Sequence, residues 1–175
     1  GAGSGAAPLG GVSLIDANHD ARASNAIAYI SPNFSGVTLA AAVVTSMDQF
    51  NSGDTMDAIS IAAMYGNGPL TVDVAYQDVD VLNSTAWKVG AGYAFDDTKV
   101  GFVYEDIDNG SAAADRDSWL LNVAHTMGPI VLKAVYGQAD VGAADHDLWA
   151  LGADYNLSKR TSAYLVYGNG DNDTT

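Results

Sequence analysis

The sequence contains no cysteine, few basic residues and no long apolar run, and each shortage excludes a class of protein. The absence of cysteine excludes a disulfide framework, thiolate chemistry and a cysteine-bound cluster. No stretch reaches the roughly 18 to 20 consecutive apolar residues of a transmembrane helix, which excludes a helical membrane protein. Seven Lys and Arg stand against 21 Asp and Glu, a net charge of −14. Such a chain would repel nucleic acid, and it has no basic patch with aromatics to offset the repulsion.

What the sequence does contain favours a turn-rich β protein. Hydrophobic residues make up 48% of the chain and charged residues 16%, whereas an ordinary domain has about 25% charged residues. There are 19 glycines, nine tyrosines and three tryptophans. A length of 175 residues predicts one domain.

The stretch WKVGAGYAFDDTKVGFVYE, residues 87 to 105, shows the pattern that organises the chain. Its residues alternate strictly on either side of the short polar turn Asp96-Asp97-Thr98, which predicts a β-hairpin. One face carries Trp, Val, Tyr and Phe, and the other carries glycine, alanine and a few charges. A soluble sheet would turn its large apolar side chains into a core. An aromatic-ended apolar face backed by small and charged residues is typical of a transmembrane barrel strand.

The same pattern recurs along the chain and predicts ten strands, at about 25–31, 37–45, 57–66, 70–78, 85–95, 99–106, 117–127, 130–139, 147–157 and 161–168. Tyr, Trp or Phe recurs at the ends of the apolar rows, and aliphatic residues fill their middles. Aromatic rings prefer the level of the lipid headgroups, so two girdles are predicted. The predicted membrane-interface aromatics are Tyr29, Tyr65, Tyr76, Trp87, Tyr93, Phe95, Tyr104, Trp119, Tyr136, Trp149, Tyr155 and Tyr167.

The predicted connections alternate between short turns and longer acidic loops. The longer ones are residues 46–56, 80–84, 108–116 and 141–146. Up-and-down strands with short turns at one rim and long polar loops at the other are typical of bacterial outer-membrane barrels. The opposite faces of the strands are small and polar, which favours a wide aqueous lumen over a filled interior.

Several phrases of the sequence, in this order, resemble the general porins of Gram-negative bacteria. They are NAIAYISPNFSGVTLAAAV, YGNGPLTVDVAYQ, AWKVGAGYAFDDTKVGFVYE, DSWLLNVAHTMGPIVLKAVYGQAD and LWALGADYNLSKRTSAYLVYG, and the resemblance covers about residues 21 to 168. It implies an all-β fold, a 16-stranded up-and-down barrel in the outer membrane, a homotrimer, and passive diffusion of small hydrophilic solutes without a cofactor.

The resemblance also implies that strands are missing. The chain looks like strands six to fifteen of sixteen, so it is expected to be a fragment or to be completed by another chain. An open edge in lipid would leave backbone groups unpaired at several kcal/mol each. Residues 1–24 are expected to be the remnant of the inward-folded constriction loop, residues 25–168 the ten-strand segment, and residues 169–175 the start of an extracellular loop.

The candidates for pore-lining or constriction residues are Asp16, Asp20, Arg22, Asp73, Lys88, Lys99, Glu105, Lys133 and Asp154. The first three lie where the constriction loop of the family returns to the wall, and Asp16 and Asp20 are either its acidic side or ordinary solvated acids. The other six share the inward parity, and they either line the lumen or pair with one another along the wall. With so many acids near the mouth, we expect a modest preference for cations that falls as salt screens the rim.

No residue pattern predicts a metal site or a catalytic centre. The acids of the long loops either bridge divalent cations to lipopolysaccharide or form a solvated rim, and no calcium-binding loop motif is present. His125 occupies an outward position where other strands carry Tyr, so an interfacial ring is predicted. There is no nucleophile elbow and no phosphate loop, so enzyme activity is not expected. The alternative function is that of a soluble acidic β-sandwich or adhesion protein, or of a plugged structural barrel.

Overall fold

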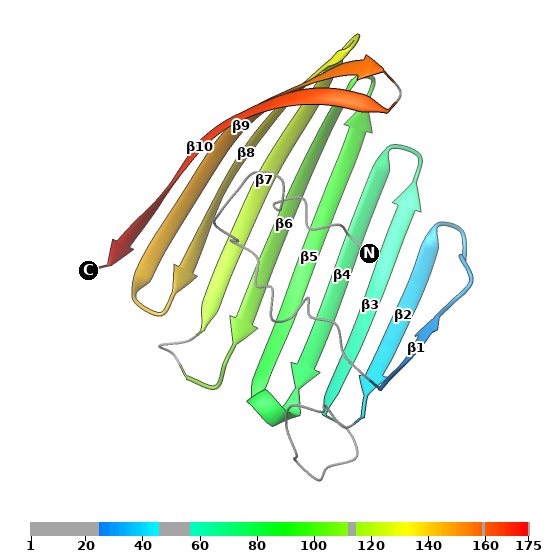
Figure 1. Cartoon of the computed structure of the whole chain (residues 1–175). Helices are drawn as coiled ribbons and strands as arrows, with labels where there is room; N and C mark the ends of the chain where they lie inside the picture. Colours follow the sequence, from blue (N-terminus) through cyan, green and yellow to red (C-terminus); the bar gives the residue numbers. More distant parts are fainter. Residues whose placement is uncertain (1–24, 46–56, 112–114, 159, 175) are drawn as a thin grey trace.

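The structure, a computed structural model, describes residues 25–45, 57–111, 115–158 and 160–174. Ten antiparallel strands form one sheet whose spatial order is the order of the sequence (Figure 1). The strands are β1 (Ala26–Ile30), β2 (Val37–Val44), β3 (Ala58–Asn67), β4 (Leu70–Val79), β5 (Ser84–Phe95), β6 (Thr98–Asp108), β7 (Arg116–Met127), β8 (Ile130–Val141), β9 (Ala144–Ser158) and β10 (Thr161–Thr174), with one 3₁₀ turn, η2 (Asp80–Leu82).

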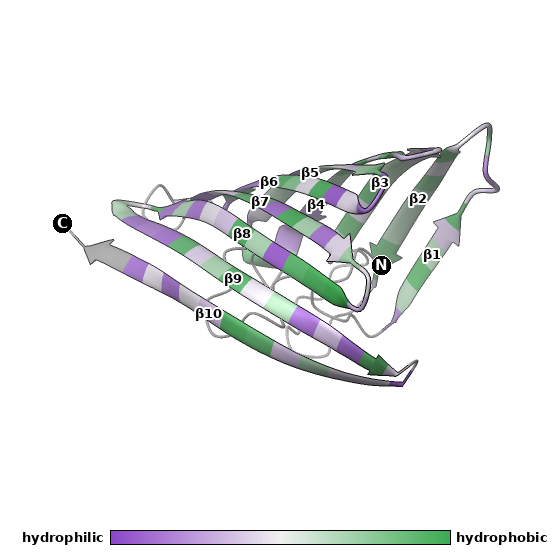
Figure 2. Ribbon diagram, turned by 90° about the horizontal axis from the view of Figure 1, so that it is seen from above, coloured by the Kyte–Doolittle hydropathy of each residue, from purple (hydrophilic) through white to green (hydrophobic). Residues whose placement is uncertain are grey.

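The sheet is a single curved layer. Seen along its rim it arches, with β1 and β10 at its two edges (Figure 2). Within the described residues each edge strand pairs on one side only, β1 with β2 and β10 with β9. The described residues contain no helix that is long and apolar enough to cross a membrane.

The period of two separates the residues of this sheet into two faces, as the sequence predicts. We call the face that carries Trp87, Tyr93 and Phe102 the outward face, and the opposite, concave face the inward wall. Most of the exposed large hydrophobic side chains within strands lie on the outward face, among them Ile61, Leu121 and Leu151.

The buried residues within strands lie on the inward wall, in small groups rather than in one core. One group is Val44, Ala58 and Val79, and another is Leu120, Val135 and Ala150. The sheet is therefore inverted relative to that of a soluble protein, because most of its large apolar side chains are exposed on one face and its buried residues form only small groups on the other.

All ten predicted strands are present, but the last three are longer than predicted. β8 continues to Val141 and β9 begins at Ala144, so the predicted loop 141–146 is wrong: the connection is the two-residue turn Gly142–Ala143. Residues 169–174, expected to start a loop, instead extend β10 along β9. Asp and Gly are disfavoured in strands, and here the ladder to the neighbouring strand overrides that preference. The predicted segments 1–24 and 46–56 lie outside the described residues.

Candidate functional site

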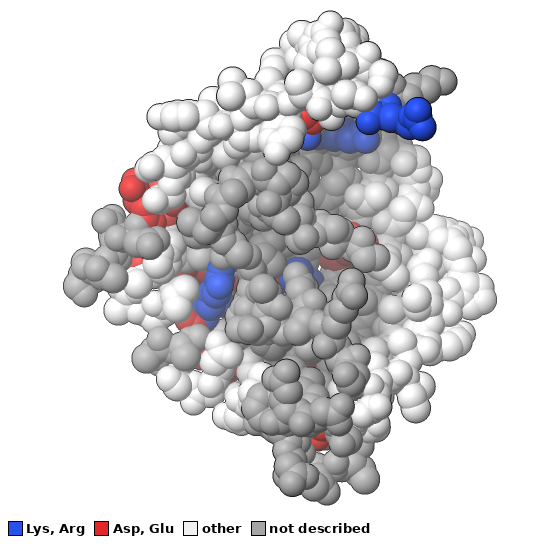
Figure 3. All heavy atoms as spheres, in the orientation of Figure 1, with Lys and Arg blue, Asp and Glu red and all other residues white. Residues whose placement is uncertain are grey.

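Six of the predicted pore-lining residues lie together on the inward wall, on strands β4 to β9. Alternation along each strand and the register between strands place them there: Lys88 of β5 lies directly opposite Glu105 of β6, and Asp73 of β4 lies opposite Gly90. In the space-filling view, basic and acidic side chains lie side by side on the concave face (Figure 3). The other three predicted residues, Asp16, Asp20 and Arg22, lie outside the described residues.

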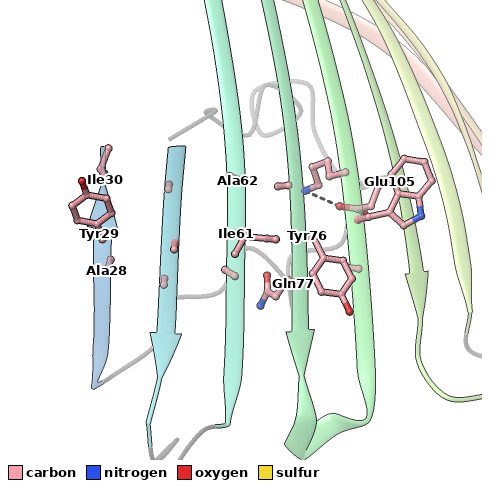
Figure 4. A pocket seen from close by; sticks show the side chains of 16 residues that line it. Ala28, Tyr29, Ile30, Ile61, Ala62, Tyr76, Gln77 and Glu105 are labelled. Carbon is pink, nitrogen blue, oxygen red and sulfur yellow. Dashed lines mark ion pairs between the residues drawn. The ribbon is translucent and has the colours of Figure 1, made fainter. Parts of the chain in front are cut away.

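Four of the six form two ion pairs. The Lys88 ammonium lies 2.6 Å from a carboxylate oxygen of Glu105, and the pair is drawn in Figure 4. Lys133 of β8 binds Asp154 of β9 on a diagonal of the ladder. The two pairs differ in burial. The side chain of Glu105 is only 1% exposed, whereas those of Lys133 and Asp154 are 43% and 25% exposed.

Asp73 and Lys99 are exposed on the same wall, and within the described part of the chain neither has an ion-pair partner within 4 Å. Lys99 lies opposite Ala124, which in turn lies opposite Lys133, so two lysines share one row of the ladder. Four of the six residues therefore pair along the inward wall, and two carry charges there without an ion-pair partner among the described residues.

The inward wall carries a different charge from the whole chain. Within the described strands, every Lys and Arg lies on it, namely Lys88, Lys99, Arg116 and Lys133, whereas its acids are Asp73, Glu105 and Asp154. Arg116 was missed in the sequence because it was assigned to the loop 108–116, and in the structure it begins β7. A net charge of −14 thus does not describe this wall, whose four basic groups slightly outnumber its three acidic ones.

Aspartates instead collect on the outward face of β6 to β9, towards the strand ends that are joined by the 109–115 connection and by the Gly142–Ala143 turn. Asp106, Asp117, Asp140 and Asp145 lie opposite one another on four consecutive strands. The Tyr104 hydroxyl donates a hydrogen bond of 2.6 Å to Asp117. Acids in this position would meet the headgroup region of a membrane rather than a channel interior.

All twelve predicted interface aromatics occupy outward positions. Next to the aspartates, aromatic rings pair across neighbouring strands: ring centroids are 5.0 Å apart for Trp87 and Tyr104 and 5.4 Å apart for Trp119 and Tyr136. A third pair, Trp149 and Tyr167, has centroids 5.5 Å apart. Such pairs stabilise each other beyond the area they bury. His125 also faces outward, and its Nδ1 lies 2.8 Å from the Thr98 hydroxyl.

A hollow of about 270 Å³ lies at the sheet between β1 and β6, and Figure 4 shows the side chains around it. Alanines contribute most of its inward lining, Gln77 and Ser60 add polar groups, and the Lys88–Glu105 pair closes one end. Within the described residues no group of three or more His, Asp or Glu could hold a metal ion. The wall around the hollow therefore offers space, charged groups and polar groups.

Comparison with known proteins agrees with this geometry. The sequence pattern of the Gram-negative porins matches residues 1–175, so the chain belongs to that family. Porins are channel proteins of the outer membrane and are not enzymes. Because the family resides in a membrane, membership overturns the alternative of a soluble sandwich. No curated sequence matches the chain.

Solved porins share the fold. The anion-selective porin from Comamonas acidovorans superposes with a TM-score of 0.74 at 24% identity, over 86% of this chain and 49% of that one. A multiple mutant of the Rh. blastica porin gives a TM-score of 0.66 at 26% identity, over 83% of this chain and 50% of that one. A variant of OmpT from Vibrio cholerae that lacks loop L8 gives a TM-score of 0.65 at 17% identity, over 85% of this chain and 58% of that one. The chain thus spans about half the length of these structures.

Proposed function

We propose that this sheet is part of the wall of a closed barrel that forms a water-filled channel for ions and small hydrophilic solutes. The observation that carries the proposal is the inverted distribution of side chains, with exposed Ile, Leu, Trp and Tyr on the outward face and Lys and Gly on the inward wall. Lipid would solvate the apolar outward face, and water would solvate the charged inward wall. Further strands must continue the ladders of β1 and β10 in lipid, since unpaired backbone groups there cost several kcal/mol each.

Residues 1–24 are proposed to be the returning part of a constriction loop inside this barrel. The loop would end at Asn25, beside the alanine-lined hollow to which β1 contributes Ala28 and Ile30. A wall of small side chains leaves room for a loop, and the basic residues of the wall would attract acids such as Asp16 and Asp20. Neutralising both acids and finding unchanged ion selectivity would contradict this assignment.

The proposed channel prefers cations weakly. The net charge of −14 favours cations near the mouth, while the basic groups of the inward wall act against them. Because the Debye length is about 10 Å at 0.1 M salt, the preference should fall as ionic strength rises. The proposed assembly is a homotrimer whose acidic outward rim contacts lipopolysaccharide.

The test is single-channel conductance of the closed barrel in a planar bilayer under a salt gradient. Conductance steps in threes, with a reversal potential slightly on the cation side, support an open trimeric channel. No conductance from protein shown to be folded and inserted would mean a plugged or structural barrel. A reversal potential on the anion side would support the proposed channel but contradict the proposed preference for cations.

A further inference from the structure

One row of the inward wall has two glycines at its centre and a polar residue on each side. Thr71 of β4 lies opposite Gly92 of β5, and Gly92 lies opposite Gly101 of β6. Gly101 in turn lies opposite Asn122 of β7. The four residues therefore cross four consecutive strands without interruption, and all face inward.

The Thr71 side chain occupies the space that a side chain at position 92 would need. A Cβ built on Gly92 would lie 2.7 Å from the Thr71 hydroxyl oxygen, closer than real Cβ contacts allow. The same hydroxyl lies 3.4 Å from the Gly92 carbonyl oxygen, to which it can donate a long hydrogen bond. Thr71 thus leans along the sheet over its neighbour instead of standing away from the wall.

Asn122 does the same from the other side. A Cβ on Gly101 would lie 2.8 Å from both the amide oxygen and the amide nitrogen of Asn122, and 3.2 Å from its Cγ. The amide group therefore lies over Gly101. Both polar side chains are exposed, so they cover the backbone of the glycines and still face water.

Neighbouring glycines of the same wall show that this is not a property of inward glycines in general. A Cβ on Gly90, two residues before Gly92, would make only ordinary contacts, the nearest at 3.9 Å from Asp73. A Cβ on Gly152 would likewise come no closer than 3.7 Å to any atom. Alanine would fit at positions 90 and 152 but would displace a side chain at 92 and 101.

We propose that Gly92 and Gly101 are width-determining residues of the channel, because they let Thr71 and Asn122 lie flat along the wall. A methyl group at either position makes the polar side chain rotate away from the sheet and into the lumen. The displaced atoms end short side chains that can rotate, so the variants keep the fold. The inference rests on the proposed channel function, because width is measured here through conductance.

The experiment compares Gly92→Ala with Gly90→Ala by single-channel conductance of the closed barrel in planar bilayers. Both variants add one methyl group to the same face of the same strand, and only the first displaces a neighbour. We expect a larger loss of conductance, and a lower size cut-off for neutral polymers, in Gly92→Ala. The double variant Gly92→Ala with Thr71→Ala should return to the conductance of Gly90→Ala, since the displaced hydroxyl is gone. Gly101→Ala and its double variant with Asn122→Ala repeat the test on the other side.

The outcomes separate the two proposals. If the parent conducts but Gly92→Ala and Gly90→Ala are equal, or removal of the Thr71 hydroxyl restores nothing, the width-determining role is overturned and the channel stands. If folded and inserted parent protein does not conduct, the channel function itself fails. Heat-modifiability on gels reports folding of each variant, so that loss of the barrel is not mistaken for a narrower one.

Discussion

Glu105 and Lys88 lie directly opposite each other on β6 and β5, with 2.6 Å between the charged atoms, but the two side chains differ in their access to water. Glu105 is 1% exposed and Lys88 is 28% exposed. A buried charge that loses its partner is costly, whereas a half-buried lysine can turn its ammonium towards water. The pair should therefore respond unequally to removal of either member.

Replacing Lys88 with Met should destabilise the barrel by about 3 kcal/mol, because it leaves the Glu105 carboxylate buried without that partner. Glu105→Gln should cost less, since Lys88 can then rehydrate. The measurement is reversible urea unfolding of each variant in lipid vesicles. A larger loss in Glu105→Gln than in Lys88→Met would contradict this view of the pair.

The second pair, Lys133 with Asp154, should matter for ions more than for stability. Both side chains are partly exposed, and exposed ion pairs contribute about 0–1 kcal/mol. Asp154→Asn should therefore leave unfolding nearly unchanged while it frees a positive charge on the inward wall. We expect the reversal potential to shift towards anions. The control is Asp147→Asn, which removes the same charge from the outward face of the same strand; equal shifts in both variants would exclude a role for Asp154 in the lumen.

The separation of the two faces could be predicted from the sequence because it depends only on a period of two. Every strand-borne residue assigned to the lumen lies on the inward wall for that reason. The Lys88–Glu105 pair could nearly be predicted too. Its register follows from the two-residue turn at Asp96 and Asp97, whereas the sequence suggested a three-residue turn that included Thr98.

Other parts of the site depend on contacts between strands that the sequence does not reveal. The register of Lys133 against Asp154 is set by the turn at Gly142 and Ala143, in a stretch that its Gly and Asp content made resemble a long loop. Arg116 begins β7, but it directly follows an acidic, glycine-containing stretch, so the sequence pattern places it in the loop 108–116. The fit of Thr71 over Gly92 depends on side-chain direction, which no periodicity shows.

Gly36 should be intolerant of a side chain for two independent reasons. Its φ of +97° is strained for any other residue, and a Cβ would lie 2.6 Å from the backbone oxygen of Gly66. Gly36→Ala is expected to lose about 1–3 kcal/mol of stability. Gly66→Ala is the matched control, because a Cβ there would meet nothing within 4 Å. The measurement is again urea unfolding in vesicles, and equal losses in both variants would mean that the turn relaxes around the added methyl group.

The assignment of the outward face to lipid can be tested at adjacent positions of β8. Leu132 is 43% exposed on the outward face, and its neighbour Val131 faces inward, opposite Asp154. A lysine facing lipid costs about 2–4 kcal/mol at the bilayer midplane and less near the interfaces. Leu132→Lys should therefore reduce stability in vesicles and slow insertion, while Val131→Lys, which gains water and a nearby carboxylate, should be tolerated. The same comparison in a detergent with a short acyl chain should narrow the difference, because water reaches the charge more easily there. If Val131→Lys were the more damaging change in vesicles, the two faces of the sheet would have to be exchanged.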